Sequence, residues 1–540
     1  MDGRTDSRKY SSALLLALFF LLLFVLHIPL LRLPYFWDEA GYYIPAARDL
    51  VLSGTLIPHS TPSNAHPPLV MALLALAWKI VGYTPVVTRT AMLLIATFSL
   101  LGVFRLAQRV ANTEVAVAST ICTALYPVFF TQSSLAQVDL AAAGLIFWGL
   151  LAYVEDRRRT AALWFSLAVL AKETAVLAPL ALFGWEMLQS LRGAGRSQPP
   201  RSAGFARRLS LLLPLIPLTV WYAFHYSRTG FVFGNPEFFR YNVQTTIQPL
   251  RILLAVGLRL WQTLGYLNLY VLTLTALFAM WLPPVSDGDQ ERRRIDWNTQ
   301  FAFLAVIVAY VLAMAVVGGA VLARYMLPVI PLVIIICVST LRRRVRQWRW
   351  IVAVVVLVFV AALVVNPPYG LTLEDNLAYR DYIVLHEHAE DFLEARYSGA
   401  RVLTAWPASD ELTRPYLGYV TRPTRVFRIE DFTAEQLIAA AELRSNFDVA
   451  LVFSTKYEPP HPWFESWRTW QRWKTQFFGY HRDVPPATAA QILAGRLVYE
   501  DRRSGQWVAV IEIEHGQLQN AAVQFSRGAD LLHSDFLPLH

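Results

Sequence analysis

Long apolar runs recur along the first two thirds of the chain, and they constrain its fold more than any other feature. A helix needs about 20 mostly apolar residues to cross the hydrocarbon core of a bilayer. Charged residues make up 16% of the 540 residues, whereas a soluble domain has about 25%. The sequence therefore predicts a polytopic α-helical membrane protein. About eleven runs are candidate spans: residues 12–31, 86–104, 115–131, 139–154, 160–171, 175–190, 209–226, 260–282, 300–317, 320–340 and 351–365.

Clusters of lysine and arginine between these runs predict the orientation, because cytoplasmic loops are enriched in both residues. The basic tail Arg4–Lys9 should be cytoplasmic, so residues 12–31 form an uncleaved first span that leads to the outer side. Arg105 and Arg109 should also be cytoplasmic, which requires an odd number of crossings between the first loop and these arginines. We therefore expect the apolar run 66–82 to be a re-entrant or interfacial helix on the outer side. The predicted location is the plasma (inner) membrane.

The composition changes near residue 366, and the chain divides there into a predicted membrane module, residues 1–366, and a predicted extracytoplasmic α/β domain, residues 367–540. The second part is rich in charge and has no long apolar run. Short runs of apolar residues predict buried strands, and residues with helical periodicity predict helices. The expected strands are 401–406, 448–453 and 507–513, and the expected helices are 381–396 and 434–444.

Four tryptophans in this second part, Trp463, Trp467, Trp470 and Trp473, share one face if the segment is helical. A stripe in the core is the slightly favoured interpretation, and a face that rests on the membrane or stacks on sugar rings is the alternative. The two cysteines, Cys122 and Cys337, lie inside apolar runs, so neither is expected to bind metal or form a disulfide.

The stretch from Tyr35 to Tyr43, directly after the first apolar run, places two adjacent carboxylates among aromatic residues at the mouth of a span. Charge so close to hydrocarbon is costly and is frequently functional. The alternative is a solvated acidic pair within an interfacial aromatic belt. The two carboxylates are Asp38 and Glu39, and Tyr42 follows them.

The predicted topology brings further polar residues to the same outer boundary. Lys172 and Glu173 could form a plain solvated turn, and Arg324 could extend along its span to the outer surface. His66 is expected to be structural rather than metal-binding, because no second histidine or cysteine lies at ligand spacing. The complete set is His66, Arg89, Asp139, Lys172, Glu173, Arg324 and Tyr325.

Carboxylates and cations at one membrane boundary suit a substrate that is a phosphate-bearing lipid. Arginine and lysine bind phosphate and stabilise the charge that develops on a leaving phosphate. A carboxylate can deprotonate an attacking hydroxyl as a general base. These residues therefore predict a membrane enzyme that acts on a polyprenyl-phosphate-like substrate. The net charge of +9 comes from short clusters between spans and does not indicate nucleic-acid binding.

Taken in order, the motifs resemble those of GT-C glycosyltransferases of the protein O-mannosyltransferase and lipid A aminoarabinose transferase type (glycosyltransferase family 39-like), over about residues 10–345. The motifs are Asp38-Glu39 with Tyr42-Tyr43, His66-Pro67-Pro68-Leu69, Arg89, Tyr126-Pro127 with Asp139, Ala171-Lys172-Glu173, and Arg324-Tyr325-Met326-Leu327-Pro328.

This resemblance implies an inverting transfer of a sugar from a polyprenyl-phosphate-sugar donor to an extracytoplasmic acceptor, which is a lipid, a protein or a glycan. It implies that Asp38 is catalytic, with Glu39 as its neighbour and Asp139 as a second acidic residue of the cavity. Arg324 and Tyr325 match a pair near the lipid phosphate. His66 stands where relatives carry lysine, and a neutral histidine binds phosphate less firmly. The resemblance implies no metal or other cofactor.

A transporter or flippase of a lipid-linked substrate is the alternative function. Transporters are often built from two related halves, and no second half repeats the first in this chain. A membrane scaffold with a sensor domain is a third class, but it leaves Asp38, Asp139 and Arg324 without a role.

Overall fold

A computed structural model describes residues 11–192, 207–234, 236, 240, 246–459 and 467–514. The chain forms two compact units, which are described separately. Unit 1 comprises Met1–Arg380 and Glu458–Gly479, and unit 2 comprises Asp381–Tyr457 and Tyr480–His540.

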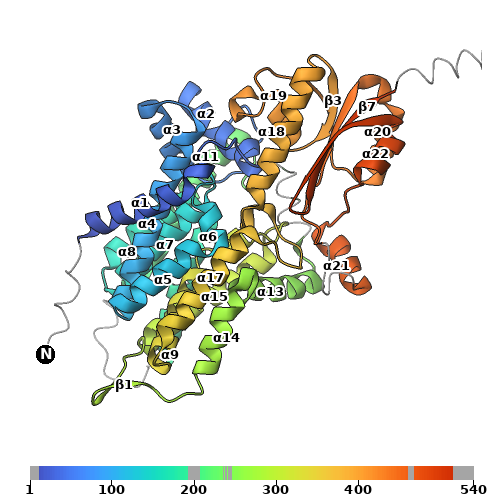
Figure 1. Ribbon diagram of the computed structural model, residues 1–540. Helices are drawn as coiled ribbons and strands as arrows, with labels where there is room; N and C mark the ends of the chain where they lie inside the picture. The colour runs from blue at the N-terminus through green and yellow to red at the C-terminus, as the bar shows by residue number, and fades with distance from the viewer. Residues whose placement is uncertain are drawn as a thin grey trace, which may run out of the picture. The chain divides into compact units, whose positions relative to one another are not determined.

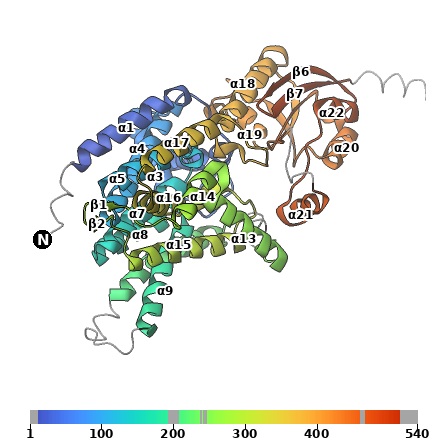
Figure 2. The ribbon, with the colours of Figure 1, turned by 60° about the horizontal axis from the view of Figure 1, so that its bottom comes forward.

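Unit 1 is helical, and α4 packs on α1, α5 and α7, with α1 beside it in Figure 2. Pro85 occupies the first turn of α4, where a missing N–H costs nothing, and the Thr84 side chain caps the helix by accepting from the Val87 N–H. The helices are α1 (Ser12–His27), α2 (Ile44–Ser53), α3 (Leu69–Val81), α4 (Pro85–Val110), α5 (Thr113–Leu125), α6 (Pro127–Gln132), α7 (Asp139–Val154), α8 (Arg158–Ala171), α9 (Leu177–Arg192), α11 (Leu215–Thr229), α13 (Pro249–Leu264), α14 (Leu269–Ala279), α15 (Trp297–Val316), α16 (Ile330–Arg344), α17 (Trp348–Val364) and α21 (Arg468–Phe478).

Small residues allow α7 to pack closely on its neighbours. A Cβ atom on Gly144 would lie 2.0 Å from Ser99 Oγ of α4, and one on Gly149 would lie 2.6 Å from the Phe165 ring of α8. This close packing fixes the position of α7, which begins at Asp139.

Six helical segments in the described ranges are long and apolar enough to cross a membrane, and four shorter helices are also apolar. The chain is thus a multi-pass membrane protein, and about eleven spans remains a prediction. The six segments are Ser12–Leu30, Pro85–Val110, Glu173–Leu191, Arg207–Thr229, Pro249–Ala279 and Trp297–Val316.

Three of the expected spans are interrupted in the structure. The helix expected over 320–340 begins only at Ile330, after a short 3-10 helix, Ala323–Met326. The run 115–131 divides at Tyr126-Pro127, since proline starts a new helix and cannot donate to the preceding one. The run 260–282 begins earlier, with α13, and breaks between Gly265 and Asn268.

Unit 2 contains most of α18 (Ala378–Arg396) and a five-stranded mixed sheet, in the order β4-β3-β5-β7-β6. β3, β4 and β5 are parallel, while β7 is antiparallel to both β5 and β6. Figure 1 shows α18 on one side of the sheet and α20 and α22 on the other. The remaining elements are β3 (Arg401–Ala405), α19 (Ala408–Thr413), β4 (Arg425–Ile429), α20 (Ala434–Glu442), β5 (Val449–Phe453), α22 (Pro486–Ile492), β6 (Gly495–Arg503) and β7 (Gln506–Ile513).

The three predicted strands and two predicted helices of this region are confirmed. β4 and β6 were not predicted, because both are edge strands whose short sequences mix charged and apolar residues without a buried run. Cys122 and Cys337 are buried and unpaired, as expected.

The interpretation of the tryptophans as a core stripe is wrong for the residues that the structure describes. α21 carries Trp470 and Trp473, none of its residues is buried, and Trp467 is 68% exposed. Trp463 lies outside the described residues. The end of α21 packs within unit 1, where Arg251 donates to the Phe477 carbonyl (3.0 Å).

Candidate active site

The loop after α1 turns sharply and separates the two adjacent carboxylates. Trp37 adopts a left-handed conformation (φ 46°), and a single π-helical turn follows from Glu39 to Tyr43. Both features are uncommon, and π turns occur frequently at functional sites. The Asp38 side chain remains 21% exposed, whereas Glu39 is fully buried.

Glu39 forms a buried ion pair with Arg89 of α4. The same carboxylate accepts from the backbone N–H groups of Phe36 (2.9 Å) and Ala136. Arg89 also donates to the carbonyls of Ser134 (3.0 Å) and Pro34 (2.8 Å). The pair therefore joins the first loop, α4 and the loop before α7.

Arg324 is the centre of a second cluster and is itself 2% exposed. It pairs with Asp38, donates to Glu374 Oε2 (2.5 Å), and lies 3.4 Å from Asp139. Gln137 accepts from Arg324 and donates to the same Glu374 oxygen (2.8 Å). Arg324 thus gathers side chains from the first loop, the start of α7 and the segment after α17.

Lys172 completes this cluster from the end of α8. Its Nζ donates to Asp139 Oδ1 (2.5 Å) and lies 4.0 Å from the centre of the Tyr325 ring. Only 6% of Lys172 is exposed, so its interpretation as part of a solvated turn is wrong. Its neighbour Glu173 faces another way and pairs with His66 Nδ1 (2.8 Å).

His66 and Tyr42 line a hollow beside the first loop. Tyr43 and Trp221 contribute to the same wall, and the Tyr43 ring stacks on the His66 ring at 6.1 Å between centroids. The ten predicted site residues therefore fall into three groups: Asp38, Asp139, Lys172, Arg324 and Tyr325 together; Glu39 with Arg89; and His66, Glu173 and Tyr42 around or beside the hollow.

Carboxylates outnumber cations in the Arg324 cluster. Asp38, Asp139 and Glu374 face two cations, Arg324 and Lys172. Burial raises the pKa of Glu374 to about 7, and burial with the adjacent Glu374 raises the pKa of Asp375 to about 8. Glu374 therefore holds a proton below neutral pH, which balances the charges of the cluster.

Two residues of this region were missed by the sequence analysis. Glu374 stands in a charged segment after the last predicted span and has no motif around it. Arg259 was missed because the expected span began at residue 260, one position after it. Arg251 and Arg259, eight residues apart in an apolar segment, were the signal that could have indicated a buried polar face on α13.

Arg259 is fully buried, and no carboxylate lies within ion-pair distance of it among the residues described. It donates to the carbonyls of Met314 (3.1 Å) and Leu322 (2.7 Å), while Nη2 has no hydrogen-bond partner in those same ranges. Its guanidinium lies 5.4 Å from the Tyr325 ring centre, and Lys172 and Arg324 lie near the same ring. Three cations therefore surround Tyr325, and one of them lacks a counter-charge.

Comparisons with known proteins agree with the resemblance found in the sequence. Residues 65–221 match the family model described as dolichyl-phosphate-mannose-protein mannosyltransferase. Among solved structures, the chain is similar to ArnT from Cupriavidus metallidurans bound to undecaprenyl phosphate, with 13% identity, a TM-score of 0.50, and coverage of 92% of this chain and 97% of that one.

The apo form of the same ArnT aligns with 14% identity, a TM-score of 0.49, and coverage of 93% and 98%. An oligosaccharyltransferase from Archaeoglobus fulgidus aligns with 13% identity, a TM-score of 0.46, and coverage of 82% and 68%. No curated protein matches the chain.

Proposed function

We propose that this chain, a membrane glycosyltransferase of the GT-C type, transfers a sugar with inversion from a polyprenyl phosphate to an extracytoplasmic acceptor. The proposal depends on the cluster in which Asp38 shares Arg324 with Asp139 and Glu374. This cluster supplies a carboxylate that can accept a proton, and Lys172 and Arg259, which lie at the adjacent Tyr325 ring, can stabilise negative charge on a leaving group.

Asp38 is the proposed general base. Its side chain is 21% exposed, whereas Asp139 and Glu374 are 3% and 4% exposed. Asp38 is therefore the carboxylate of the cluster that an acceptor hydroxyl can reach. Arg324 fixes its orientation, and a base positioned in this way contributes about 10²- to 10⁴-fold to a rate.

The proposed phosphate site lies around Tyr325, between Lys172 and Arg259. A buried guanidinium without a counter-charge is costly, and a phosphate would supply both the charge and the acceptor that Nη2 lacks. Asp139 holds Lys172 in place through its 2.5 Å contact. The undecaprenyl phosphate named with the ArnT structure supports this class of ligand.

The reaction follows from these positions. The acceptor oxygen attacks the anomeric carbon of the donor, and its proton passes to Asp38. The bond between that carbon and the phosphate oxygen breaks, and the electron pair leaves with the polyprenyl phosphate. Lys172 and Arg259 stabilise the additional negative charge on this leaving group. Attack opposite to the leaving group inverts the anomeric configuration.

Glu39 and Arg89 are assigned a positioning role in this scheme. Both are buried and bonded to each other and to loop backbone, so they hold the strained first loop that presents Asp38. We propose that the hollow at Tyr42 and His66 receives part of the acceptor or of the donor sugar, because it opens beside that loop.

The test is turnover of a panel of radiolabelled polyprenyl-phosphate sugars by the purified protein in detergent. Release of label from one donor, lost in Asp38→Asn and retained in Asp287→Asn, is the expected result. Asp287 is a suitable control because it is an exposed carboxylate of the β1–β2 hairpin (Ser286–Asp287 and Gln290–Glu291). If sealed vesicles instead move an unmodified donor across the bilayer and no donor is cleaved, the transporter interpretation holds.

A further inference from the structure

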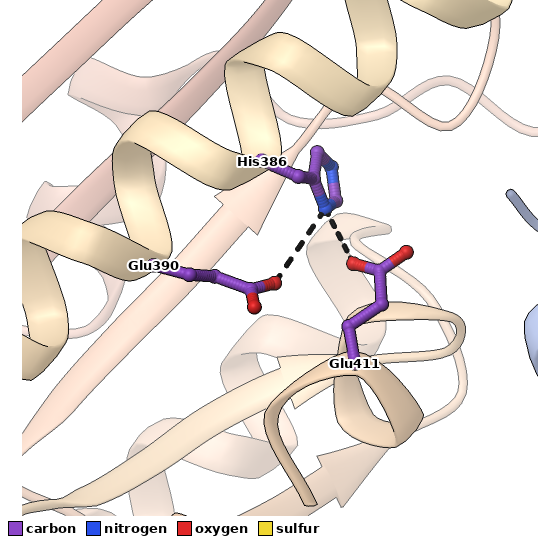
Figure 3. Close-up of side chains that lie close together, drawn as sticks. All are labelled: His386, Glu390 and Glu411. Atoms are coloured by element: carbon purple, nitrogen blue, oxygen red, sulfur yellow. Dashed lines mark hydrogen bonds and ion pairs between the residues drawn. The ribbon is translucent and has the colours of Figure 1, made fainter. Parts of the chain in front are cut away.

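Unit 2 contains a second cluster of titratable side chains, which the proposed transfer does not use. His386, Glu390 and Glu411 are 1%, 0% and 0% exposed. They form the one group of three or more histidine, cysteine or acidic side chains with metal-binding geometry in the described part of the chain. Figure 3 shows the three side chains converging on one point.

Two elements supply these side chains. His386 and Glu390 are four residues apart on α18, so they lie on one face of the helix, one turn from each other. Glu411 comes from α19, which follows β3. Stacking on Tyr382 (3.9 Å between centroids) and an edge contact with Phe453 (4.6 Å) fix the His386 ring.

The distances suit a small cation at the point of convergence. His386 Nδ1 lies 2.7 Å from Glu411 Oε2 and 4.0 Å from Glu390 Oε1, and the candidate ligand atoms all lie within 4.8 Å of one another. Ligands bonded at about 2.0–2.2 Å in a tetrahedral site are about 3.3–3.6 Å apart. Movements of less than about 1 Å would bring the imidazole and the two carboxylates to that spacing.

His386 Nδ1 and Glu411 Oε2 form a hydrogen bond, but the other polar atoms of this cluster have no partner among the described residues. Neither oxygen of Glu390 has a hydrogen-bond partner among the described residues, nor do Glu411 Oε1 and His386 Nε2. Within those residues, no lysine or arginine forms an ion pair with either glutamate. Two buried carboxylates without a cation are costly unless a proton or a metal ion compensates them.

We propose that His386, Glu390 and Glu411 form a structural site for a divalent transition-metal cation such as Zn²⁺. An imidazole with two carboxylates is a ligand set that such cations accept. Either oxygen of Glu390, or both, can bind, and water can complete the coordination. The site is fully buried, so the cation would link α18 to α19 and stabilise unit 2. This inference does not depend on the proposed glycosyl transfer.

The test uses untagged full-length protein purified in detergent from Zn²⁺-supplemented cells, with metal content measured by mass spectrometry. We expect about one Zn²⁺ per chain and a Tm that falls by several degrees on chelation and recovers when Zn²⁺ is added back. Glu390→Gln and Glu411→Gln should lose the metal and the Tm response. Glu394→Gln, one turn further along α18 and hydrogen-bonded to Thr421 outside the cluster, should keep both.

Measurements on the wild-type protein alone can overturn the proposal, so the test remains valid even if a variant fails to fold. Wild-type protein without bound metal, whose Tm responds neither to the chelator nor to added Zn²⁺, would show that the two carboxyl groups share a proton instead. Zn²⁺ retained at the wild-type level in Glu390→Gln and Glu411→Gln would show that the metal binds elsewhere. X-ray absorption of the wild-type protein should show one imidazole nitrogen with oxygen ligands and no sulfur.

Discussion

Replacing Arg259 with methionine tests whether this arginine binds the phosphate of the lipid or only supports the fold. In the absence of ligand, Arg259 bonds to carbonyls and Gln262, with no carboxylate partner in the described ranges and with Nη2 unpartnered. Its removal therefore leaves no buried charge behind. A hydrogen bond to a charged group contributes about 1.5–3 kcal/mol, so Arg259→Met should weaken polyprenyl phosphate binding by about 10- to 150-fold.

Arg89→Met is the matched control, because Arg89 is equally buried but paired with Glu39. Removing one partner of a buried ion pair costs about 3–5 kcal/mol of stability, so this variant should show a much lower Tm without ligand. Arg259→Met leaves the carbonyls of Met314 and Leu322 and the Gln262 side chain without their donor. Its Tm should therefore fall, but less than that of Arg89→Met, and it should lose the stabilisation that added polyprenyl phosphate gives. Unchanged lipid affinity in Arg259→Met would refute the phosphate site around Tyr325.

Three further predictions concern Glu39, Glu374 and Gly144. Glu39→Gln should destabilise the protein by about 3–5 kcal/mol, because Arg89 loses its buried partner, and it should lower kcat less than Asp38→Asn does, because the base itself remains; a kcat loss with an unchanged Tm would contradict this. The pKa of Glu374 is raised by burial to about 7, so its protonated form contributes stability that is present below pH 4.5 and is lost as the pH rises through about 7. Glu374→Gln should reduce the dependence of Tm on pH between pH 5 and pH 8. An unchanged dependence would show that other groups cause it. Gly144→Ala should cost about 1–3 kcal/mol by overpacking, since its Cβ would lie 2.0 Å from Ser99 Oγ, and a Tm equal to that of the wild type would show that α4 and α7 can separate without loss.

The sequence was informative wherever a charged residue stood next to an apolar run. Asp38, Asp139, Lys172, Arg324 and Tyr325 were expected at one membrane boundary, and the structure brings them together in one cluster. Hydropathy indicated where the apolar runs end, and the distribution of lysine and arginine predicted which of these ends lie on the same side of the membrane.

The same reasoning could not find Glu374 or separate Asp38 from Glu39. Glu374 reaches Arg324 from a segment 50 residues further along the chain, and hydropathy does not indicate which loop folds back onto the site. The adjacent carboxylates diverge because they are consecutive residues at the start of a helical turn. That turn follows the left-handed Trp37, which no residue pattern near it indicates. Arg259 was missed because the expected span began one residue after it, and segment boundaries are what sequence patterns predict least well.

The central claim is that Asp38 is the base of a transfer from polyprenyl phosphate, and a comparison of binding with chemistry tests it most directly. With the donor identified by the panel, the single-turnover rate at saturating donor and the affinity for polyprenyl phosphate would be measured in wild-type protein and Asp38→Asn. We predict a rate about 10²- to 10⁴-fold lower with lipid affinity nearly unchanged, because Lys172 and Arg259 remain to bind the phosphate. Transfer by Asp38→Asn at the wild-type rate would contradict the account.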